Sequence, residues 1–253
     1  MRLQHLHLNK LSDYGVVSAI QEMTVSKYLA NKASSTPRPI NPTIMTMEFN
    51  PVYTCGRREI GTIDKKQENY LCADGKASFY QALRGGQTTF HGPGQLVAYP
   101  IIDLRRHRIT PRDYVCLLEK SVIATCAEFG VKAMTTENTG VWTTPERKIS
   151  ALGLHMRRNI TSHGIGLNVN TDLWWFDRIV ACGLAGKETT SLQREGVTGK
   201  TVQEVGGVFV KKFAEKLGVD GVDVMEDHED YMEGLDRQIR GNLEAVQPGS
   251  SAE

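Results

Sequence analysis

Residues 151–169 read ALGLHMRRNITSHGIGLNV, and this stretch decides the fold class. Apolar residues occupy alternate positions over 152–156 and again over 165–169. A period of two is typical of a strand that turns one face toward a core. The polar run Arg157-Arg158-Asn159 between the two segments favours a turn. The stretch therefore predicts two neighbouring strands joined as a hairpin.

Three helices are expected: two precede this hairpin in the sequence and one follows it. The first is predicted from Val16 to Ala30 by its apolar face. The second is predicted from a Thr110 cap, followed by a proline, to Phe129, with a glycine as its stop. The third opens at Thr201 and carries one apolar stripe, made of Val202, Val205, Phe209, Phe213 and Leu217.

Further strands are expected over 3–11, 45–49 and 96–102, and a proline-containing loop over 32–42. Strands and helices follow one another without a strict β-α-β alternation. We therefore predict the α+β class: a single domain with a mixed or antiparallel sheet and flanking helices. The expected domain spans 1–220, and 221–253 is expected to be a C-terminal extension with a frayed polar end.

The composition is that of an ordinary globular protein. The chain has 253 residues, of which 40% are hydrophobic, and a core of this size needs neither disulfides nor metal. The net charge of +1 gives no basic surplus, which argues against a general nucleic-acid binder. No run approaches the length of a membrane-spanning helix. Arg2 and Lys10, with no acid before Asp13, faintly resemble a mitochondrial presequence, but the alternation there favours a strand.

The cysteine pattern argues against a zinc site or a disulfide framework. The count of five is odd and no two cysteines have C-x-x-C spacing, which indicates a reducing compartment. Cys116 and Cys126 lie in an apolar helical stretch, so both are expected to be small buried hydrophobes.

A glycine-rich stretch, RGGQTTFHGPGQ over 84–95, is the first candidate binding segment. Glycines allow positive φ angles and a close approach of a ligand to the backbone. The stretch matches neither the phosphate-binding G-x-x-x-x-G-K-[ST] pattern nor G-x-G-x-x-G, so a ligand loop and a plain glycine-rich hairpin both remain open. Arg84 and His91 are its polar candidates, although a lone histidine is more often structural.

Lys148 and Cys182 are the candidate reactive residues. Lys148 begins an apolar strand, where it is either a solvated strand end or a partly buried amine whose pKa desolvation would lower. Cys182 lies in the glycine-flanked turn ACGLAG over 181–186, which suits a thiol that a substrate must reach. Spacing alone does not say whether Lys148 or His91 would be its partner.

Four strings occur together in order: RGGQTTFHGPGQLVAYP (84–100), KISALGL (148–154), SHGIGLNVN (162–170) and ACGLAG (181–186). Together they resemble the lipoyl (octanoyl) transferases, also called the lipoate-protein ligase B family, over about residues 3–218. The segment 51–57 is similar as well. The chain differs from the common bacterial sequences of the family at Cys55 and Phe90, so the resemblance does not specify its fine substrate preference.

The resemblance implies a fold like the catalytic domains of biotin and lipoate ligases. It implies transfer of an octanoyl (or lipoyl) group from acyl carrier protein to a lysine of lipoyl domains, in 2-oxoacid dehydrogenase complexes and the glycine cleavage H protein. Cys182 would carry the acyl thioester, and Lys148 would lower its pKa and relay protons. The implied acyl-site residues are Arg84, Gly85, Gly86, Gln87, Thr88, Thr89, Phe90, His91, Ala151, Leu152, Gly153, Gly164, Ile165 and Gly166.

The remaining expectations concern cofactors, partners, cellular compartment and alternative functions. We expect no cofactor, no metal, no nucleic-acid or membrane partner, and a monomer, in the mitochondrion or, for a bacterial chain, the cytoplasm. The basic run over 105–108 is either a solvated patch or a docking site for the acidic carrier. The rival functions are an ATP-dependent lipoate or biotin ligase on the same fold, another cysteine acyltransferase or amidase that uses Cys182 with His91, and a non-catalytic carrier-binding module.

Overall fold

The computed structural model describes residues 1–179 and 186–225. Its larger sheet has eight strands in the order β10-β8-β9-β6-β2-β1-β11, with β7 paired to β8. Both β2 and β11 run parallel to β1, β10 runs parallel to β8, and the other pairs are antiparallel. The predicted mixed sheet is therefore confirmed. The strands are β1 (Leu3–His7), β2 (Thr43–Met47), β6 (Gln95–Ile101), β7 (Val141–Trp142), β8 (Arg147–Arg157), β9 (Ile160–Asn168), β10 (Glu188–Thr189) and β11 (Val222–Val224).

The predicted hairpin is β8 and β9. Arg157 pairs with Ile160, so the turn consists of Arg158 and Asn159 alone. Their φ angles are 50° and 68°, as a two-residue turn that follows the twist of the strands requires. The first strand of the hairpin begins at Arg147, earlier than the alternation indicated, because its opening residues pair with β7 and β10 instead of showing one free face.

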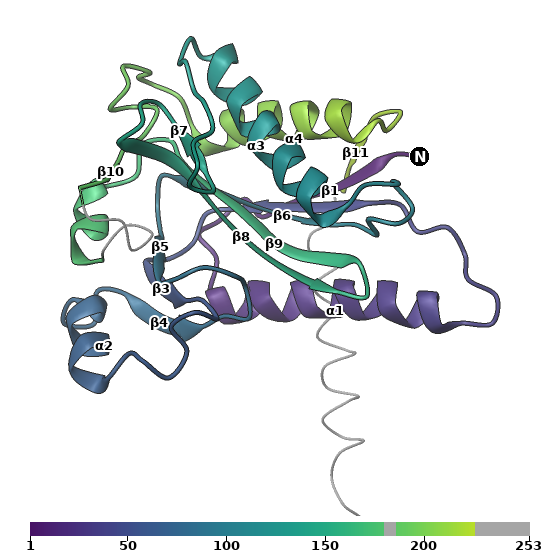
Figure 1. The fold of residues 1–253 in the computed structure, drawn as a ribbon, viewed down its shortest axis with the longest axis horizontal. Helices are drawn as coiled ribbons and strands as arrows, with labels where there is room; N and C mark the ends of the chain where they lie inside the picture. Colours follow the sequence, from purple (N-terminus) through teal and green to yellow (C-terminus); the bar gives the residue numbers. More distant parts are fainter. Residues whose placement is uncertain (180–185, 226–253) are drawn as a thin grey trace, which may run out of the picture.

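Helices cover both faces of the sheet (Figure 1). On one face α3 (Pro111–Glu128) and α4 (Val202–Leu217) pack into one core with β6 and β9, and on the other α1 (Tyr14–Ala33) packs on β2 and β6. Thr110 and Thr201 both form the capping boxes that fix where α3 and α4 begin. All five residues of the predicted α4 stripe are buried or nearly so.

Three sequence expectations, on the first strand, the first helix and Cys116, need correction. The first strand ends at His7 and not at Leu11, whose side chain is exposed. The first helix begins at Tyr14 because the Asp13 carboxylate caps it, and it continues to Ala33, so the proline-containing loop is shorter than predicted. Cys116 is exposed, since the buried face of α3 advances in steps of four through Tyr114 to Cys126 and leaves Cys116 on the opposite side.

A small lobe beside the main sheet was not predicted. It holds the three-stranded sheet β4-β3-β5, a short helix and a 3₁₀ turn, at the lower left of Figure 1. Tyr53, Leu71 and Phe90 form its core. Its elements are β3 (Val52–Cys55), α2 (Lys65–Cys72), β4 (Ser78–Gln81), β5 (Thr89–His91) and η1 (Leu173–Arg178).

The glycine-rich stretch 84–95 connects the small lobe to the main sheet. It leaves β4, contributes β5 to the lobe, and enters β6 of the main sheet at Gln95. Because β5 pairs with β3, the stretch is a link between two sheets and not the plain hairpin that was one alternative. Within the described ranges, no helix is long and apolar enough to span a membrane.

Candidate active site

A cavity of about 540 Å³ lies between the glycine-rich stretch and the β8–β9 hairpin. This volume is within the range of pockets that hold small organic ligands. Every predicted acyl-site residue lines it except Phe90. Phe90 is fully buried in the small lobe, where its ring stacks on that of Trp175 with centroids 4.8 Å apart.

Lys148 lines the cavity at the start of β8 as a buried amine, with 7% of its surface exposed. Its Nζ donates a hydrogen bond to the carbonyl of Thr139 at 3.0 Å and lies 4.5 Å from the centre of the Trp142 ring. Gly140 makes this possible: its φ is 130°, and a Cβ there would come within 3.0 Å of the lysine Cε. Of the two alternatives for Lys148, the structure therefore has the buried amine.

Arg84 is the structural centre of the glycine-rich stretch. Its guanidinium donates to the carbonyl and hydroxyl oxygens of Thr54, at 2.6 Å and 2.7 Å, and to the carbonyls of Gly85 and Gln87. These bonds fold the stretch around the side chain and leave its positive charge beside the cavity. Arg84 consequently shapes the wall as well as lining it.

His91 is buried and tied into a chain of amides. Its Nδ1 donates to Gln95 Oε1 at 2.6 Å, Gln95 Nε2 donates to Asn168 Oδ1, and Asn168 Nδ2 donates to the carbonyl of Thr190. Burial lowers the pKa of His91 to about 4, with the Arg84 charge acting in the same direction. The ring is therefore neutral at physiological pH and its Nδ1 is committed to Gln95.

The strand glycines admit neighbouring groups at the cavity wall. A Cβ on Gly153 would lie 2.8 Å from Arg84 Cδ, and a Cβ on Gly166 would lie 3.1 Å from Gln95 Oε1. A Cβ on Gly164 would lie 2.1 Å from the carbonyl oxygen of Ala98 on β6. These glycines therefore let side chains and a neighbouring strand approach, in addition to widening the cavity.

Sequence analysis did not single out His163, which also lines the cavity. It has a φ of 57°, its ring packs edge-on against Tyr99, and its Nδ1 has no hydrogen-bond partner in the described part of the chain. Burial lowers its pKa to about 3, with the Arg84, His155 and His91 charges adding to the effect. Its position directly before Gly164, inside a strand, was the only available signal.

Cys182 lies outside the described residues. The last described residue before it is Ile179, three positions earlier in the sequence, and Ile179 lines the cavity. There η1 is fixed to the small lobe, because Tyr53 Oη donates to the Trp175 carbonyl at 2.5 Å and Arg178 donates to the Tyr70 carbonyl at 2.7 Å.

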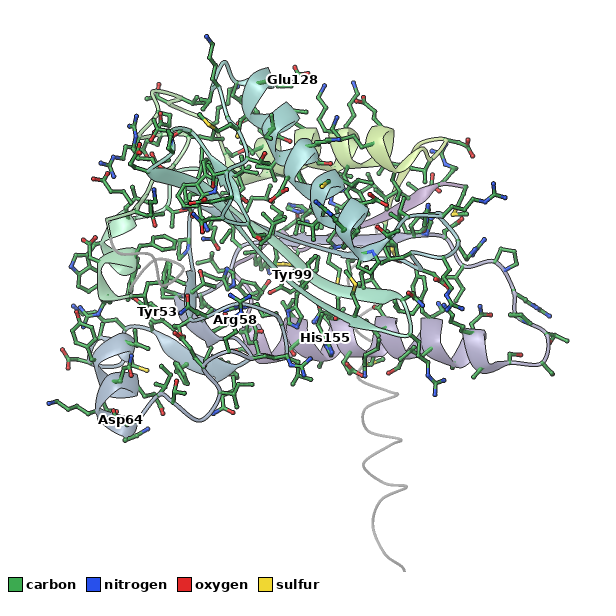
Figure 2. The ribbon with its side chains drawn as sticks, viewed as in Figure 1. Tyr53, Arg58, Asp64, Tyr99, Glu128 and His155 are labelled. Atoms are coloured by element: carbon green, nitrogen blue, oxygen red, sulfur yellow. The ribbon has the colours of Figure 1, made fainter. Side chains whose placement is uncertain are left out.

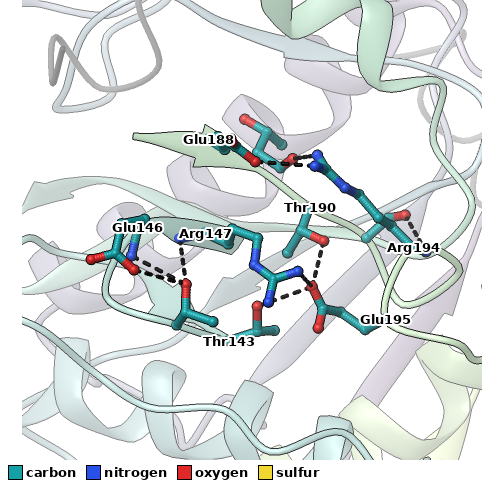
Figure 3. A network of polar contacts seen from close by, with 10 residues as sticks. Thr143, Glu146, Arg147, Glu188, Thr190, Arg194 and Glu195 are labelled. Atoms are coloured by element: carbon teal, nitrogen blue, oxygen red, sulfur yellow. Dashed lines mark hydrogen bonds and ion pairs between the residues drawn. The ribbon is translucent and has the colours of Figure 1, made fainter. Parts of the chain in front are cut away.

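A polar network holds the chain on the C-terminal side of Cys182 (Figure 3). Glu195 Oε1 accepts hydrogen bonds from Thr190 at 2.7 Å and Thr143 at 3.1 Å, and pairs with Arg147 at 3.2 Å. This network joins the segment after β10 to the first residue of β8, next to Lys148. Both flanks of residues 180–185 are thus anchored close to the cavity that Lys148 lines.

The cavity wall carries few charges. Figure 2 shows Arg58 between Tyr53 of the small lobe and Tyr99 of the main sheet. Among the described lining residues, Arg58, Arg84 and Lys148 are cationic and Glu137 is the one carboxylate. In the same part of the chain, no three His, Cys, Asp or Glu residues gather in a way that could hold a metal ion.

Comparison with known proteins identifies one family and a consistent set of relatives. Residues 18–214 match the family model described as the lipoyl protein ligase A/B catalytic domain. A Schizosaccharomyces pombe protein named "Probable octanoyltransferase" is 52% identical over 78% of this chain and 89% of its own. The mitochondrial octanoyl-acyl-carrier-protein:protein N-octanoyltransferase of Danio rerio is 45% identical over 75% of this chain and 81% of its own.

Solved structures share the fold at low sequence identity. The bipartite lipoate protein ligase of Thermoplasma acidophilum superposes with a TM-score of 0.66 at 16% identity, covering 97% of this chain and 94% of the other. The biotin protein ligase of Aquifex aeolicus gives a TM-score of 0.50 at 14% identity, over 85% of this chain and 70% of the other. The expected likeness to both ligase types is confirmed at the level of fold.

Proposed function

Because this chain belongs to the lipoyl protein ligase A/B family, within its octanoyltransferase group, we propose that it moves the octanoyl group through a thioester on Cys182. The overall reaction is that of an octanoyl-acyl-carrier-protein:protein N-octanoyltransferase. Its donor is the octanoyl thioester of acyl carrier protein and its acceptor is a lysine of a lipoyl domain. The proposal adds the residues that perform the two steps.

In the first step the Cys182 thiolate attacks the carbonyl carbon of the donor thioester. A bond forms between the Cys182 sulfur and the acyl carbon, the bond from that carbon to the carrier's sulfur breaks, and the carrier thiolate takes up a proton. A thiolate is required because the thiol is a poor nucleophile. The Lys148 ammonium, whose Nζ lies at the cavity wall, favours the thiolate by its charge and can supply the proton to the departing sulfur.

In the second step a lysine of the lipoyl domain attacks the Cys182 thioester. An amide bond forms, the bond between the acyl carbon and the Cys182 sulfur breaks, and the nitrogen loses a proton. The attacking lysine must be neutral, so a proton acceptor has to be present. Lys148, left neutral by the first step, accepts that proton and regains its charge. Backbone N–H groups of the glycine-rich stretch are suited to stabilise the oxyanion of each tetrahedral intermediate.

The observation that supports this proposal is the burial of Lys148 at the wall of a cavity of about 540 Å³. Lysine side chains are among those most rarely buried in proteins. The Nζ of Lys148 contacts the Thr139 carbonyl and the face of the Trp142 ring. His91 is less suited to the role, because its Nδ1 is committed to Gln95 and burial lowers its pKa.

The test is a reconstitution with octanoyl-acyl carrier protein and an apo lipoyl domain, in the absence of ATP and magnesium. Octanoylation of the lipoyl domain, and no reaction with free octanoate plus Mg-ATP, is the expected result. Modification only when free octanoate and ATP are supplied would instead identify an ATP-dependent ligase. Carrier binding without any turnover would identify a binding module.

We further propose that the enzyme acts in the mitochondrion, as a monomer, with residues 1–220 as the catalytic unit, to whose sheet the first residues of the C-terminal extension add the edge strand β11. The zebrafish relative is named as mitochondrial, which supports the first part. Lipoyl domains of 2-oxoacid dehydrogenase complexes and the glycine cleavage H protein are the expected acceptors. Neither a cofactor nor a metal ion is needed for thioester exchange and aminolysis as written above.

A further inference from the structure

Two adjacent arginines, Arg57 and Arg58, lie beside the glycine-rich stretch. Both are exposed, and Arg58 is one of the lining residues. They lie in the turn after β3, and this turn is fastened to the glycine-rich stretch. The Arg57 N–H donates to the Arg84 carbonyl at 3.0 Å and the Arg58 N–H donates to the Gly86 carbonyl at 3.3 Å. Their backbone is therefore set relative to the acyl site.

The acid next to them does not neutralise them. Glu59 turns inward, where its Oε2 accepts from the backbone N–H of Thr88 at 2.6 Å and from the Thr88 hydroxyl at 2.7 Å. Across residues 1–179 and 186–225, no ion pair involves Arg57 or Arg58. The pair thus presents two guanidinium groups to solvent beside the cavity.

Strand β8 passes close to these arginines. His155 directly follows Leu154, a lining residue of the cavity, on this strand. Burial lowers the pKa of His155, and the Arg157 and Arg57 charges lower it further, which indicates how close Arg57 is to this strand. The carboxylate that lines the cavity, Glu137, comes from the loop before β7.

We propose that Arg57 and Arg58 bind the phosphodiester of the donor's prosthetic arm. The inference rests on the proposed function, in which the donor is an acyl thioester on a phosphopantetheine carrier. Such an arm has the thioester at one end and a phosphate at the other. Arginine forks match phosphate oxygens in pairs, and these charge-assisted hydrogen bonds are among the strong ones. With the acyl end beside Lys148, the phosphate end leaves the cavity past Arg58.

The basic run over 105–108 is not placed for this contact. None of its residues lines the cavity. It is joined to the hairpin turn, since the Leu104 N–H donates to the Asn159 carbonyl at 2.9 Å. From Lys148 to Arg157 is nine residues of strand, which spans roughly 30 Å. That run can meet the surface of the carrier protein, but it is far from the reacting end of the arm.

The test compares octanoyl-phosphopantetheine with octanoyl-pantetheine, two small donors that differ in the phosphate alone. We expect the double variant Arg57→Ala/Arg58→Ala to lose kcat/KM for the phosphorylated donor about ten- to a hundredfold more than for the other. The matched control, Arg105→Ala/Arg108→Ala, also removes two exposed arginines and should not separate the two donors. Equal losses for both donors, or none, would overturn the proposal.

A binding measurement keeps this test independent of turnover. By calorimetry the wild-type protein should bind phosphopantetheine at least about tenfold more tightly than pantetheine, and the double variant should bind the two alike. If the wild type binds them equally, the phosphate site is wrong whatever the enzyme's activity. If it prefers phosphopantetheine but transfers no acyl group, the phosphate site stands and the proposed function fails.

Discussion

At the scale of single residues, Lys148 is the side chain on which the proposed chemistry depends. Lys148→Met removes the charge and the exchangeable protons while keeping an unbranched chain against Trp142. We expect kcat/KM for octanoyl transfer to fall by about 10²- to 10⁴-fold, the usual contribution of a positioned acid–base group.

Separate measurement of the two half-reactions sharpens this prediction. Lys148→Arg keeps a charge beside the thiolate but cannot release a proton near neutral pH. It should therefore acylate faster than Lys148→Met and still be slow in transfer to the lipoyl domain. Wild-type rates in Lys148→Met, with a circular dichroism spectrum like that of the wild type, would remove Lys148 from the mechanism.

Alanine substitution at two glycines is expected to change the unfolding free energy in opposite directions. In Gly164→Ala the new Cβ would lie 2.1 Å from the Ala98 carbonyl oxygen, so strands β6 and β9 must separate locally. We expect this variant to lose about 1–3 kcal/mol of unfolding free energy, as overpacked cores do. In Gly207→Ala, on an exposed turn of α4, a Cβ meets no atom within 4 Å, and the helix should gain about 0.5–1 kcal/mol.

Denaturant unfolding of the two glycine variants beside the wild type measures both changes. The prediction fails if the two variants shift the midpoint in the same direction. It also fails if Gly164→Ala unfolds at the wild-type midpoint, since the β6–β9 pairing would then tolerate a side chain that the structure excludes.

Some residues of the cavity could be predicted from the sequence and others could not. Lys148 and His91 could be selected from their glycine-rich and apolar surroundings, and both line the cavity. Phe90 could not be separated from its neighbours, because whether a side chain points to the cavity or to the small lobe depends on the β3–β5 register. His163 was not singled out, because the alternation was interpreted only over 165–169 and the positive φ of His163 cannot be read from the residue type.

At the scale of elements, the link between β8 and the segment after β10 depends on Glu195. Its side chain is 15% exposed and joins Arg147, Thr143 and Thr190. Glu195→Ala leaves these partners partly buried without their acceptor. We expect a loss of about 1.5–3 kcal/mol, the range for hydrogen bonds to a charged group.

The matched control is Glu188→Ala, which breaks the ion pair with Arg194. Both of those side chains are about half exposed, so the change should be at most about 1 kcal/mol. Thermal unfolding of the two variants tests the comparison. If Glu188→Ala costs as much as Glu195→Ala, the network does not work as a buried anchor.

The elements also explain which parts of the fold could be predicted. The helices with caps and long apolar stripes, α3 and α4, were found nearly to the residue. The short strands β3, β4, β5 and β10 were not, because strands of two to four residues carry too few alternations to show a period. The small lobe and the part of the cavity wall that it contributes could therefore not be predicted as structure, although the glycine-rich motif was recognisable.

At the scale of the whole molecule, buried histidines make stability depend on pH. Burial lowers the pKa of His5 and His91 to about 4 and that of His163 to about 3, against an ordinary value near 6.5. Between these values the unfolded chain binds protons that the folded chain does not. Stability is therefore complete above pH 6.5 and decreases as the pH falls toward 4.

A single substitution tests this linkage. His163→Asn removes one of the buried imidazoles, and asparagine tolerates the positive φ at this position. Between about pH 4 and 6 the unfolding free energy should depend less steeply on pH in the variant than in the wild type. The slope should be smaller by the contribution of one proton, about 1.4 kcal/mol per pH unit. Urea unfolding at several pH values measures the slope, and parallel curves for the two proteins would contradict the prediction.

The proposed mechanism requires an acyl group carried by Cys182. The measurement that tests it most directly is the intact mass of the enzyme after mixing with octanoyl-acyl carrier protein. It is made for the wild type, for Cys182→Ser, and for Cys116→Ser as a control for acylation of an exposed cysteine. We predict one hydroxylamine-labile octanoyl group on the wild type and on Cys116→Ser, and none on Cys182→Ser. An adduct that persists in Cys182→Ser, or octanoyl transfer that continues without Cys182, would contradict the thioester route.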